Sequence, residues 1–287
     1  MDSRERSLEL NERLIASLSA SDALRDSRVE AAFRATPRHQ YLPGFTLQEA
    51  YADDAVRTKT GADGTVLSSA SQPAIVAIML QQLRVMTGHN VLEVGTGTGY
   101  NAALMRHLVG PAGHVLSLDV DQDICESARA NLDRAGVSGV QVERQDGAAG
   151  WPERAPYDRI IVTASAFDLS PEWLNQLRPG GRLVVPVALL EPPRPHLSAS
   201  LVRDGDWLRG EWVQPCGFLP LRGELMPESS LSAGGMEGDA DEDLLRELSS
   251  LVLDAWPAGA RPRAGGCRLY WPRPNFSFCL HRATSTS

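Results

Sequence analysis

The sequence predicts an α/β fold in which helices cover both faces of a mostly parallel sheet. Between about residues 88 and 200, short apolar segments alternate with segments of helical periodicity. The apolar segments are nearly continuous, which is typical of parallel strands buried on both faces. Glycine or acidic residues stand where three of these segments end. Ligands of open α/β sheets bind at the carboxyl ends of the strands, so a site is expected there.

The alternation assigns a range to each element of this region. Strands are expected at 91–95, 114–120, 140–146, 157–165 and 182–190, helices at 100–108, 122–135 and 171–177, and a turn at 179–181. Parallel neighbours of this kind are joined by right-handed crossovers.

The flanking regions differ in pattern from this alternating core. Helical spacing at 5–35 is interrupted near 19–27, a Gly/Asp-rich loop is expected at 59–65, and Pro73 is placed to open a helix that runs to Leu83. Beyond residue 190 we expect a hairpin turning at Asp204-Gly205, a mobile acidic loop at 228–243, a helix at 243–254 and a folded tail that buries Trp207 and Trp212. We therefore divide the chain into an N-terminal helical region (1–64), a core (65–200) and a C-terminal extension (201–287) that could recognise substrate.

Charge and composition exclude several classes of protein. The net charge of −8 does not suit non-specific binding to nucleic acid, which needs a basic surface. No apolar run approaches the roughly 20 residues that span a bilayer, and the charged N-terminus lacks the apolar segment of a signal peptide. The four cysteines have no metal-ligand spacing. We expect a cytoplasmic protein without a metal, membrane or nucleic-acid partner; the oligomeric state stays open, with a monomer favoured.

A glycine-rich loop is the strongest local signal. Gly95, Gly97 and Gly99 follow a strand and open a helix, whose free N–H groups suit a carboxylate such as that of S-adenosylmethionine. Glu93, at the end of the strand, could face the ammonium group of that cofactor. A dinucleotide site is the rival interpretation, although its third glycine stands one position later, where this chain has Tyr100.

Two aspartates at the next strand ends strengthen the first interpretation. Asp119 could accept hydrogen bonds from both ribose hydroxyls, and Asp146, followed by Gly147, could accept from the adenine amino group. The alternative is that both carboxylates cap the helices that follow them.

Several motifs in the same order resemble the protein-L-isoaspartate O-methyltransferase family. They are PRHQYLP (37–43), AYAD (50–53), SASQPAIVA (69–77), VLEVGTGTGYNAA (91–103), DGAAGWPERAPYDRIIVTASA (146–166) and QLRPGGRLVVPV (176–187). The resemblance implies a doubly wound, Rossmann-like class I methyltransferase fold with seven strands. It also implies S-adenosylmethionine as donor and a peptide or protein acceptor that carries an aspartyl or isoaspartyl carboxylate.

The resemblance also implies the site residues. Those expected to bind cofactor are Gln72, Glu93, Gly95, Thr96, Gly97, Thr98, Gly99, Asp119, Asp146 and Gly147. Ser71 matches a family serine implicated beside the acceptor carboxylate, and Ser69 stands where the family usually has threonine. Since a carboxylate is ionised at neutral pH, no general base is needed, and we expect both serines to act by hydrogen bonding to it. Ser71 could instead cap the next helix, and His39 is expected to be structural.

Two departures from the family pattern bear on the activity. The loop KTGADGTVLSSASQP is longer and richer in serine than usual, and the chain continues well beyond the last shared strand. Both features resemble a branch that methylates an aspartate in a cyclised, ribosomally made peptide (lanthipeptide, graspetide or lasso peptide) and leads to an aspartimide. We take this as the leading hypothesis. The alternatives are a general isoaspartyl repair enzyme, a small-molecule methyltransferase and a non-catalytic cofactor-binding subunit.

Overall fold

The computed structural model describes residues 2–188, 196–226, 267–270 and 279–282, so the loop and helix expected at 228–254 lie outside it. The helices are α1 (Ser3–Ala20), α2 (Ser27–Ala35), α3 (Leu47–Tyr51), α4 (Pro73–Leu83), α5 (Tyr100–Val109), α6 (Gln122–Arg134) and α7 (Pro171–Gln176), with short 3-10 turns η1 (Arg38–Tyr41), η2 (Gly147–Ala149) and η3 (Pro152–Arg154). The strands are β1 (Val56–Thr60), β2 (Val66–Ala70), β3 (Asn90–Val94), β4 (His114–Asp119), β5 (Val140–Arg144), β6 (Tyr157–Val162), β7 (Leu177–Ala188), β8 (His196–Asp204), β9 (Trp207–Cys216), β10 (Cys267–Tyr270) and β11 (Cys279–Arg282). No helix in these ranges is long and apolar enough to cross a membrane.

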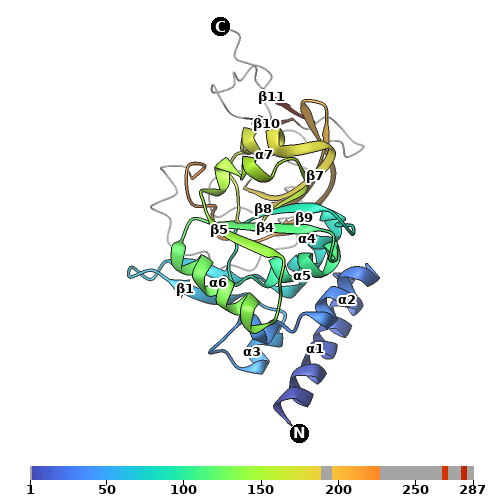
Figure 1. The fold of residues 1–287 in the computed structure, drawn as a ribbon, viewed down its shortest axis with the longest axis vertical. Coiled ribbons are helices and arrows are strands. Elements are labelled where there is room, and N and C mark those ends of the chain that lie inside the picture. The colour runs from blue at the N-terminus through green and yellow to red at the C-terminus, as the bar shows by residue number, and fades with distance from the viewer. Residues whose placement is uncertain (1, 189–195, 227–266, 271–278, 283–287) are drawn as a thin grey trace, which may run out of the picture.

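A single large sheet runs through the molecule in the order β10-β11-β9-β8-β7-β6-β3-β4-β5 (Figure 1). The strands from β5 to β7 are parallel to their neighbours, whereas β8 and β9 form the antiparallel hairpin expected around Asp204-Gly205. These seven strands confirm the mostly parallel sheet, and the short strands β11 and β10 extend it beyond β9.

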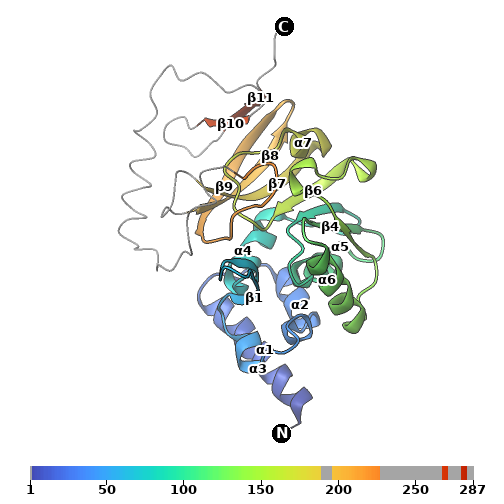
Figure 2. The ribbon, with the colours of Figure 1, turned by 90° about the vertical axis from the view of Figure 1, so that its left-hand side faces the viewer.

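Helices pack on both faces of the sheet, so the fold is doubly wound (Figure 2). Neighbouring residues of one strand enter different cores, because side chains alternate across a strand. On β3, Val91 packs with α4, α5 and α6, whereas Leu92 packs on the opposite face with Trp173 of α7.

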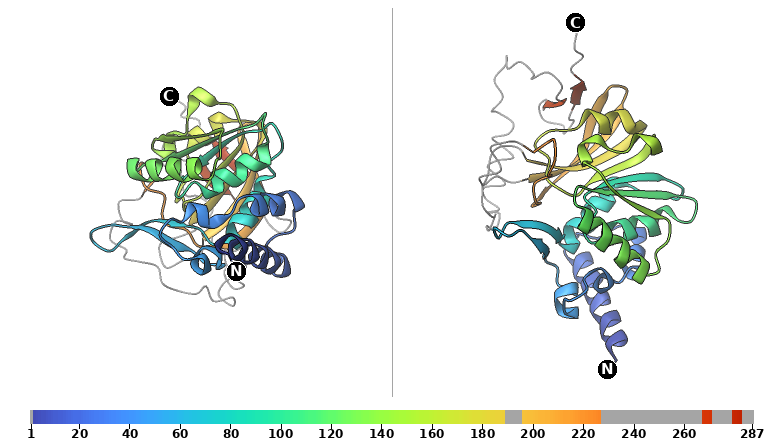
Figure 3. Two further views of the ribbon diagram at one scale, coloured as in Figure 1. Left: turned by 60° about the horizontal axis from the view of Figure 1, so that its bottom comes forward. Right: turned by 60° about the vertical axis from the view of Figure 1, so that its left-hand side comes forward.

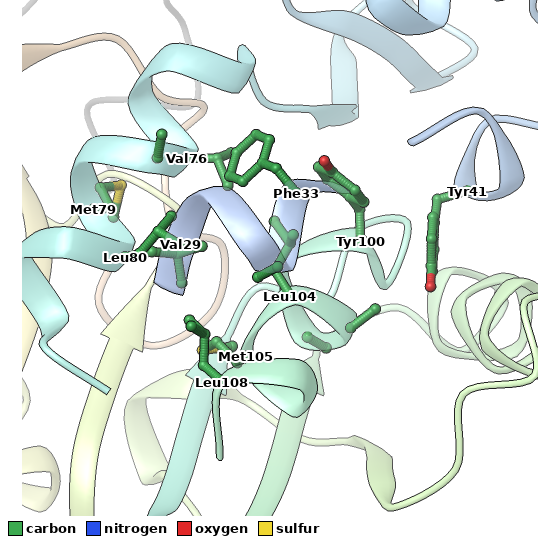
Figure 4. Packing of buried hydrophobic residues seen from close by; sticks show 14 of the residues in the cluster. Val29, Phe33, Tyr41, Val76, Met79, Leu80, Tyr100, Leu104, Met105 and Leu108 are labelled. Atoms are coloured by element: carbon green, nitrogen blue, oxygen red, sulfur yellow. The ribbon is translucent and has the colours of Figure 1, made fainter. Parts of the chain in front are cut away.

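The N-terminal helices share one of these cores. Val29 and Phe33 of α2 pack against Val76 and Leu80 of α4 and against α5 (Figure 4). The Tyr100 ring lies between Phe33 and Tyr41, with centroids 6.1 Å and 5.4 Å apart. The first residue of α5 is thereby fixed by the chain that precedes the sheet.

The loop expected at 59–65 is present as the turn of the β1–β2 hairpin, which projects from the body of the molecule (Figure 3), although the two strands were not predicted. Two other local expectations were wrong. Pro179, Gly180 and Gly181, expected to form a turn, lie inside β7, at an irregularity in its pairing with β6. Trp207 and Trp212 are 41% and 38% exposed, because they lie on the outward side of β9 while Leu208 points inward.

Candidate active site

The ends of three parallel strands bring the candidate cofactor residues to one edge of the sheet. β4 pairs with β3 on one side and with β5 on the other, all in the same direction. The loop after β3, Asp119 at the end of β4 and Asp146 after β5 are therefore neighbours, as the sequence predicts. Thr163, directly after β6, completes this edge.

The glycine-rich loop is held close to β4 and to Thr163. The N–H groups of Gly95 and Thr96 both donate to Leu118 O, at 2.8 and 3.0 Å. The Thr163 hydroxyl donates to Gly95 O at 2.7 Å. Gly95 has φ +101°, and a Cβ there would lie 2.4 Å from Thr163 Oγ1. Only glycine fits this position without moving the loop.

Glu93 lies beneath the loop and is completely buried. Its two carboxylate oxygens accept hydrogen bonds from Asn101 Nδ2 at 2.7 Å and from Ser117 Oγ at 2.5 Å. Ser117 is in turn hydrogen-bonded to Thr96 Oγ1 at 2.7 Å. Burial raises the pKa of Glu93 to about 7, opposed by these hydrogen bonds. Glu93 and Thr96 thus belong to a buried network that joins the loop to β4 and α5.

Asp119 faces the loop from the end of β4. Its side chain is 10% exposed, and the carboxylate accepts from Gly97 N–H at 3.3 Å and Asp121 N–H at 3.2 Å. Burial raises its pKa, and Arg222 opposes that rise. It does not cap α6, because the N-cap residue is Asp121.

Asp146 has a partner on each oxygen. One oxygen accepts from Ala148 N–H at 2.9 Å and caps η2, as the capping interpretation expects. The other accepts from Glu224 N–H at 2.8 Å. A Cβ on Gly223 would lie 2.4 Å from this carboxylate, so only a glycine at position 223 lets the backbone come this close to Asp146. Gly147 packs directly on Val94.

The sequence did not predict that residues 219–224 return to this edge of the sheet. Leu219 O accepts from Ser165 N–H and Leu221 N–H donates to Ser165 O, both at 2.8 Å. The Arg222 guanidinium then donates to Asp121 at 2.9 Å, where Lys59 Nζ of β1 also donates at 2.9 Å. These contacts join residues far apart in the chain, and no local motif marks them.

Of the predicted acceptor residues, Ser69 lies on β2 beside the glycine-rich loop, and Ser71 follows directly after the end of β2. Ser69 and Ser71 are half-buried, and Ser69 O is 3.7 Å from the position of a Cβ on Gly97. The capping role considered for Ser71 is wrong, because Asp53 Oδ1 accepts from Ala74 N–H at 2.8 Å instead. Gln72 is exposed and its amide donates to Asp53. His39 pairs with the Tyr51 hydroxyl at 2.7 Å.

A pocket of about 310 Å³ adjoins the loop. Gly97 and Thr98 line it together with Lys59 and Ser68 of the hairpin and one side of α6. The Thr98 carbonyl accepts from Asn131 Nδ2 at 3.0 Å, which fixes the loop to α6.

Comparison with known proteins identifies the family. The profile of protein-L-isoaspartate(D-aspartate) O-methyltransferase matches residues 9–224. Protein-L-isoaspartate O-methyltransferase 2 of Polaromonas sp. is 39% identical over 69% of this chain and 90% of its own. Protein-L-isoaspartate O-methyltransferase of Methanopyrus kandleri is 38% identical over 74% of this chain and 91% of its own.

Solved structures agree with these sequence matches. A protein-L-isoaspartate O-methyltransferase structure superposes with a TM-score of 0.69 and 31% identity, covering 75% of this chain and 67% of its own. A Plasmodium falciparum structure in complex with S-adenosyl-L-homocysteine, only 18% identical, shares the fold with a TM-score of 0.63 over 74% and 98%. This chain belongs to the protein-L-isoaspartate O-methyltransferase family and is an S-adenosylmethionine-dependent carboxyl methyltransferase.

Proposed function

We propose that this protein methylates the free carboxylate of isoaspartyl residues in peptides and proteins. The observation that supports this most is the closeness of β2 to the glycine-rich loop, with Ser69 O 3.7 Å from a Cβ position on Gly97. An acceptor held at Ser69 and Ser71 would thus be next to a cofactor held by the loop. The curated relatives, named for isoaspartyl methylation, favour this general activity over the cyclised-peptide activity that the sequence led us to expect.

The hydrogen-bonding groups at the strand ends fit S-adenosylmethionine. The first turn of α5 offers N–H groups to a carboxylate, and the Asp119 and Asp146 carboxylates can accept from hydroxyl and amino groups. When bound, the cofactor supplies an electrophilic methyl group attached to a sulfonium.

The reaction is an in-line displacement at that methyl carbon. Methyl transfer would form a bond between an acceptor carboxylate oxygen and the methyl carbon as the carbon–sulfur bond breaks, and the electron pair of that bond would stay on sulfur. No proton is transferred in this reaction, so no residue is needed as a general base. Ser69 and Ser71 would orient the acceptor by hydrogen bonds, which is the positioning that brings two reactants together productively.

A second candidate is the specialised activity on a cyclised ribosomal peptide. The observation in its favour is that the family profile ends at residue 224 whereas the chain continues to residue 287. The extension could select one macrocycle and exclude linear peptides.

Mass spectrometry separates the two candidates. The purified protein and S-adenosylmethionine are offered unrelated linear isoaspartyl peptides and, separately, the cyclised peptide encoded nearest to the gene. A gain of one methylene on the linear peptides supports the general activity. A gain on the cyclised peptide alone, followed by loss of methanol, would replace it with the specialised one.

A further inference from the structure

A buried arginine lies directly behind the proposed acceptor strand. Arg38, in η1, is 0% exposed. Its guanidinium donates to five backbone carbonyls, those of Ala50 (3.0 Å), Ala52 (3.1 Å), Asp54 (3.2 Å), Ala70 (3.3 Å) and Ser71 (3.0 Å). These carbonyls come from two separate segments, the end of α3 with the residues that follow it, and the last residue of β2 with Ser71 after it.

The guanidinium therefore fixes the backbone of Ser71 against the 50–54 segment. The same segment holds the start of α4, because the Asp53 carboxylate accepts from Ala74 N–H and from the Gln72 amide. The chain around Ser71 is thus attached to the 50–54 segment at two points. Arg38 holds it at Ala70 and Ser71, and Asp53 holds it at Ala74.

The charge of Arg38 has no direct counter-ion. In the described ranges no carboxylate lies within ion-pair distance of the guanidinium, and the five acceptors of its hydrogen bonds are neutral carbonyls. Asp53 and Asp54 attract it from further away, but both are exposed and already accept other hydrogen bonds. A buried cation without a carboxylate partner is unfavourable, so it needs an explanation.

Arg38 also reaches the cofactor side of the site. Burial raises the pKa of the hydroxyl of Tyr100, the residue that follows Gly99 and begins α5, and the positive charge of Arg38 opposes that rise. That hydroxyl is buried without a hydrogen-bond partner, as is Arg38 Nε. The ring is held between Phe33 and Tyr41 (Figure 4). One cation thus contacts the end of the acceptor strand and acts electrostatically on the first residue of the helix that follows the glycine-rich loop.

We propose that Arg38 is a positioning residue for methyl transfer, which fixes Ser71 through its carbonyl and supplies the positive charge that attracts the acceptor carboxylate. The inference rests on the proposed function, since it takes the isoaspartyl carboxylate as the negative charge that this fully buried cation attracts without contact. It predicts that the site distinguishes a charged acceptor from a neutral one of the same shape.

The test compares Arg38→Met, Arg38→Lys and a control, Gln82→Met. Gln82 is equally buried, but its side chain bonds to Ser198, away from the acceptor strand. For each protein we would measure thermal stability, affinity for S-adenosylhomocysteine, and affinity for an isoaspartyl peptide and for its α-carboxamide analogue. Turnover of the isoaspartyl peptide gives KM and kcat.

The wild type and Gln82→Met should prefer the carboxylate peptide over the amide. Arg38→Met should lose that preference and raise KM roughly tenfold, with S-adenosylhomocysteine affinity unchanged. Arg38→Lys, which keeps the charge but cannot reach five carbonyls, should keep the preference and lower kcat. The inference is overturned if Arg38→Met changes only stability, as Gln82→Met does, or, should Arg38→Met not fold, if Arg38→Lys has wild-type kcat. If the wild type binds the carboxylate peptide more tightly than the amide but methylates no isoaspartyl peptide, the proposed function is wrong, whereas the charge effect of Arg38 is supported.

Discussion

The Ser117 hydroxyl on β4 donates a 2.5 Å hydrogen bond to the Glu93 carboxylate on β3. Both residues are completely buried, and the same hydroxyl contacts Thr96 of the glycine-rich loop. A carboxylate enclosed in this way holds its proton more tightly in the folded protein than in the unfolded chain. The loop is therefore supported by a group that titrates near neutral pH.

Glu93 should make stability fall as pH rises. Its pKa is about 7 in the folded protein against 4.5 for the reference carboxyl, so its ionisation disfavours folding between these values. Glu93→Gln removes that dependence while keeping groups able to bond Asn101 and Ser117. The stability of the variant relative to wild type should grow by up to about 3 kcal/mol between pH 4.5 and 7. Urea unfolding at several pH values measures this, and a constant difference would contradict the buried titration.

Gly95→Ala should disrupt the cofactor loop. Its φ of +101° is unfavourable for alanine, and the new Cβ would overlap Thr163 Oγ1. We expect a loss of roughly 2–4 kcal/mol in unfolding free energy and no measurable cofactor binding. Gly136→Ala is the control, since its φ is +68° with open space around the Cβ, and it should cost about 1 kcal/mol. Similar losses in both variants would show that backbone conformation alone matters.

Asp119→Asn should weaken cofactor binding without unfolding the protein. The amide is the same shape, but it accepts hydroxyl hydrogen bonds less strongly than a carboxylate. Affinity for S-adenosylhomocysteine should drop roughly tenfold by calorimetry. Asp123→Asn, on the exposed start of α6 and paired with Lys59, should change it by less than about twofold. Equal effects would point to general charge rather than to the ribose contact proposed for Asp119.

Ser71→Ala should slow methyl transfer and leave stability unchanged. Asp53, not Ser71, caps α4, so removing the hydroxyl should not weaken the helix. The kcat/KM for an isoaspartyl peptide should fall roughly tenfold or more, with wild-type affinity for S-adenosylhomocysteine. Ser68→Ala, which removes a hydrogen bond to Thr58, should keep activity. A Ser71 variant with full activity would remove this residue from the proposed mechanism.

The central sheet and its site edge could be predicted because they depend on local pattern. Apolar runs in the sequence predict β3 and β4, and they also predict that Asp119 lies at the end of β4. Contacts made by distant segments could not be predicted. Arg222 meets Asp121 only because the chain after β9 returns to Ser165, and Arg38 is a surface-type residue that only tertiary structure shows to be buried.

Local residue types left two features unpredicted. The glycine and aspartate residues at 59–65 correctly predict a loop, but the flanking residues pair as β1 and β2 although their polar composition does not resemble a core strand. Ser71 has a residue type suited to capping, yet a carboxylate nineteen residues from Gln72 takes that position. Propensity describes what a residue can do locally, and tertiary packing decides which residue does it.

The most direct test of the proposed function is the specificity constant for two synthetic peptides of one sequence, differing only in whether a single residue is isoaspartyl or aspartyl. We predict that kcat/KM for the isoaspartyl peptide exceeds that for the aspartyl peptide by at least roughly a hundredfold, since only the former presents its free carboxylate in the required place. Equal values for the two peptides, or turnover of the aspartyl peptide alone, would contradict the account.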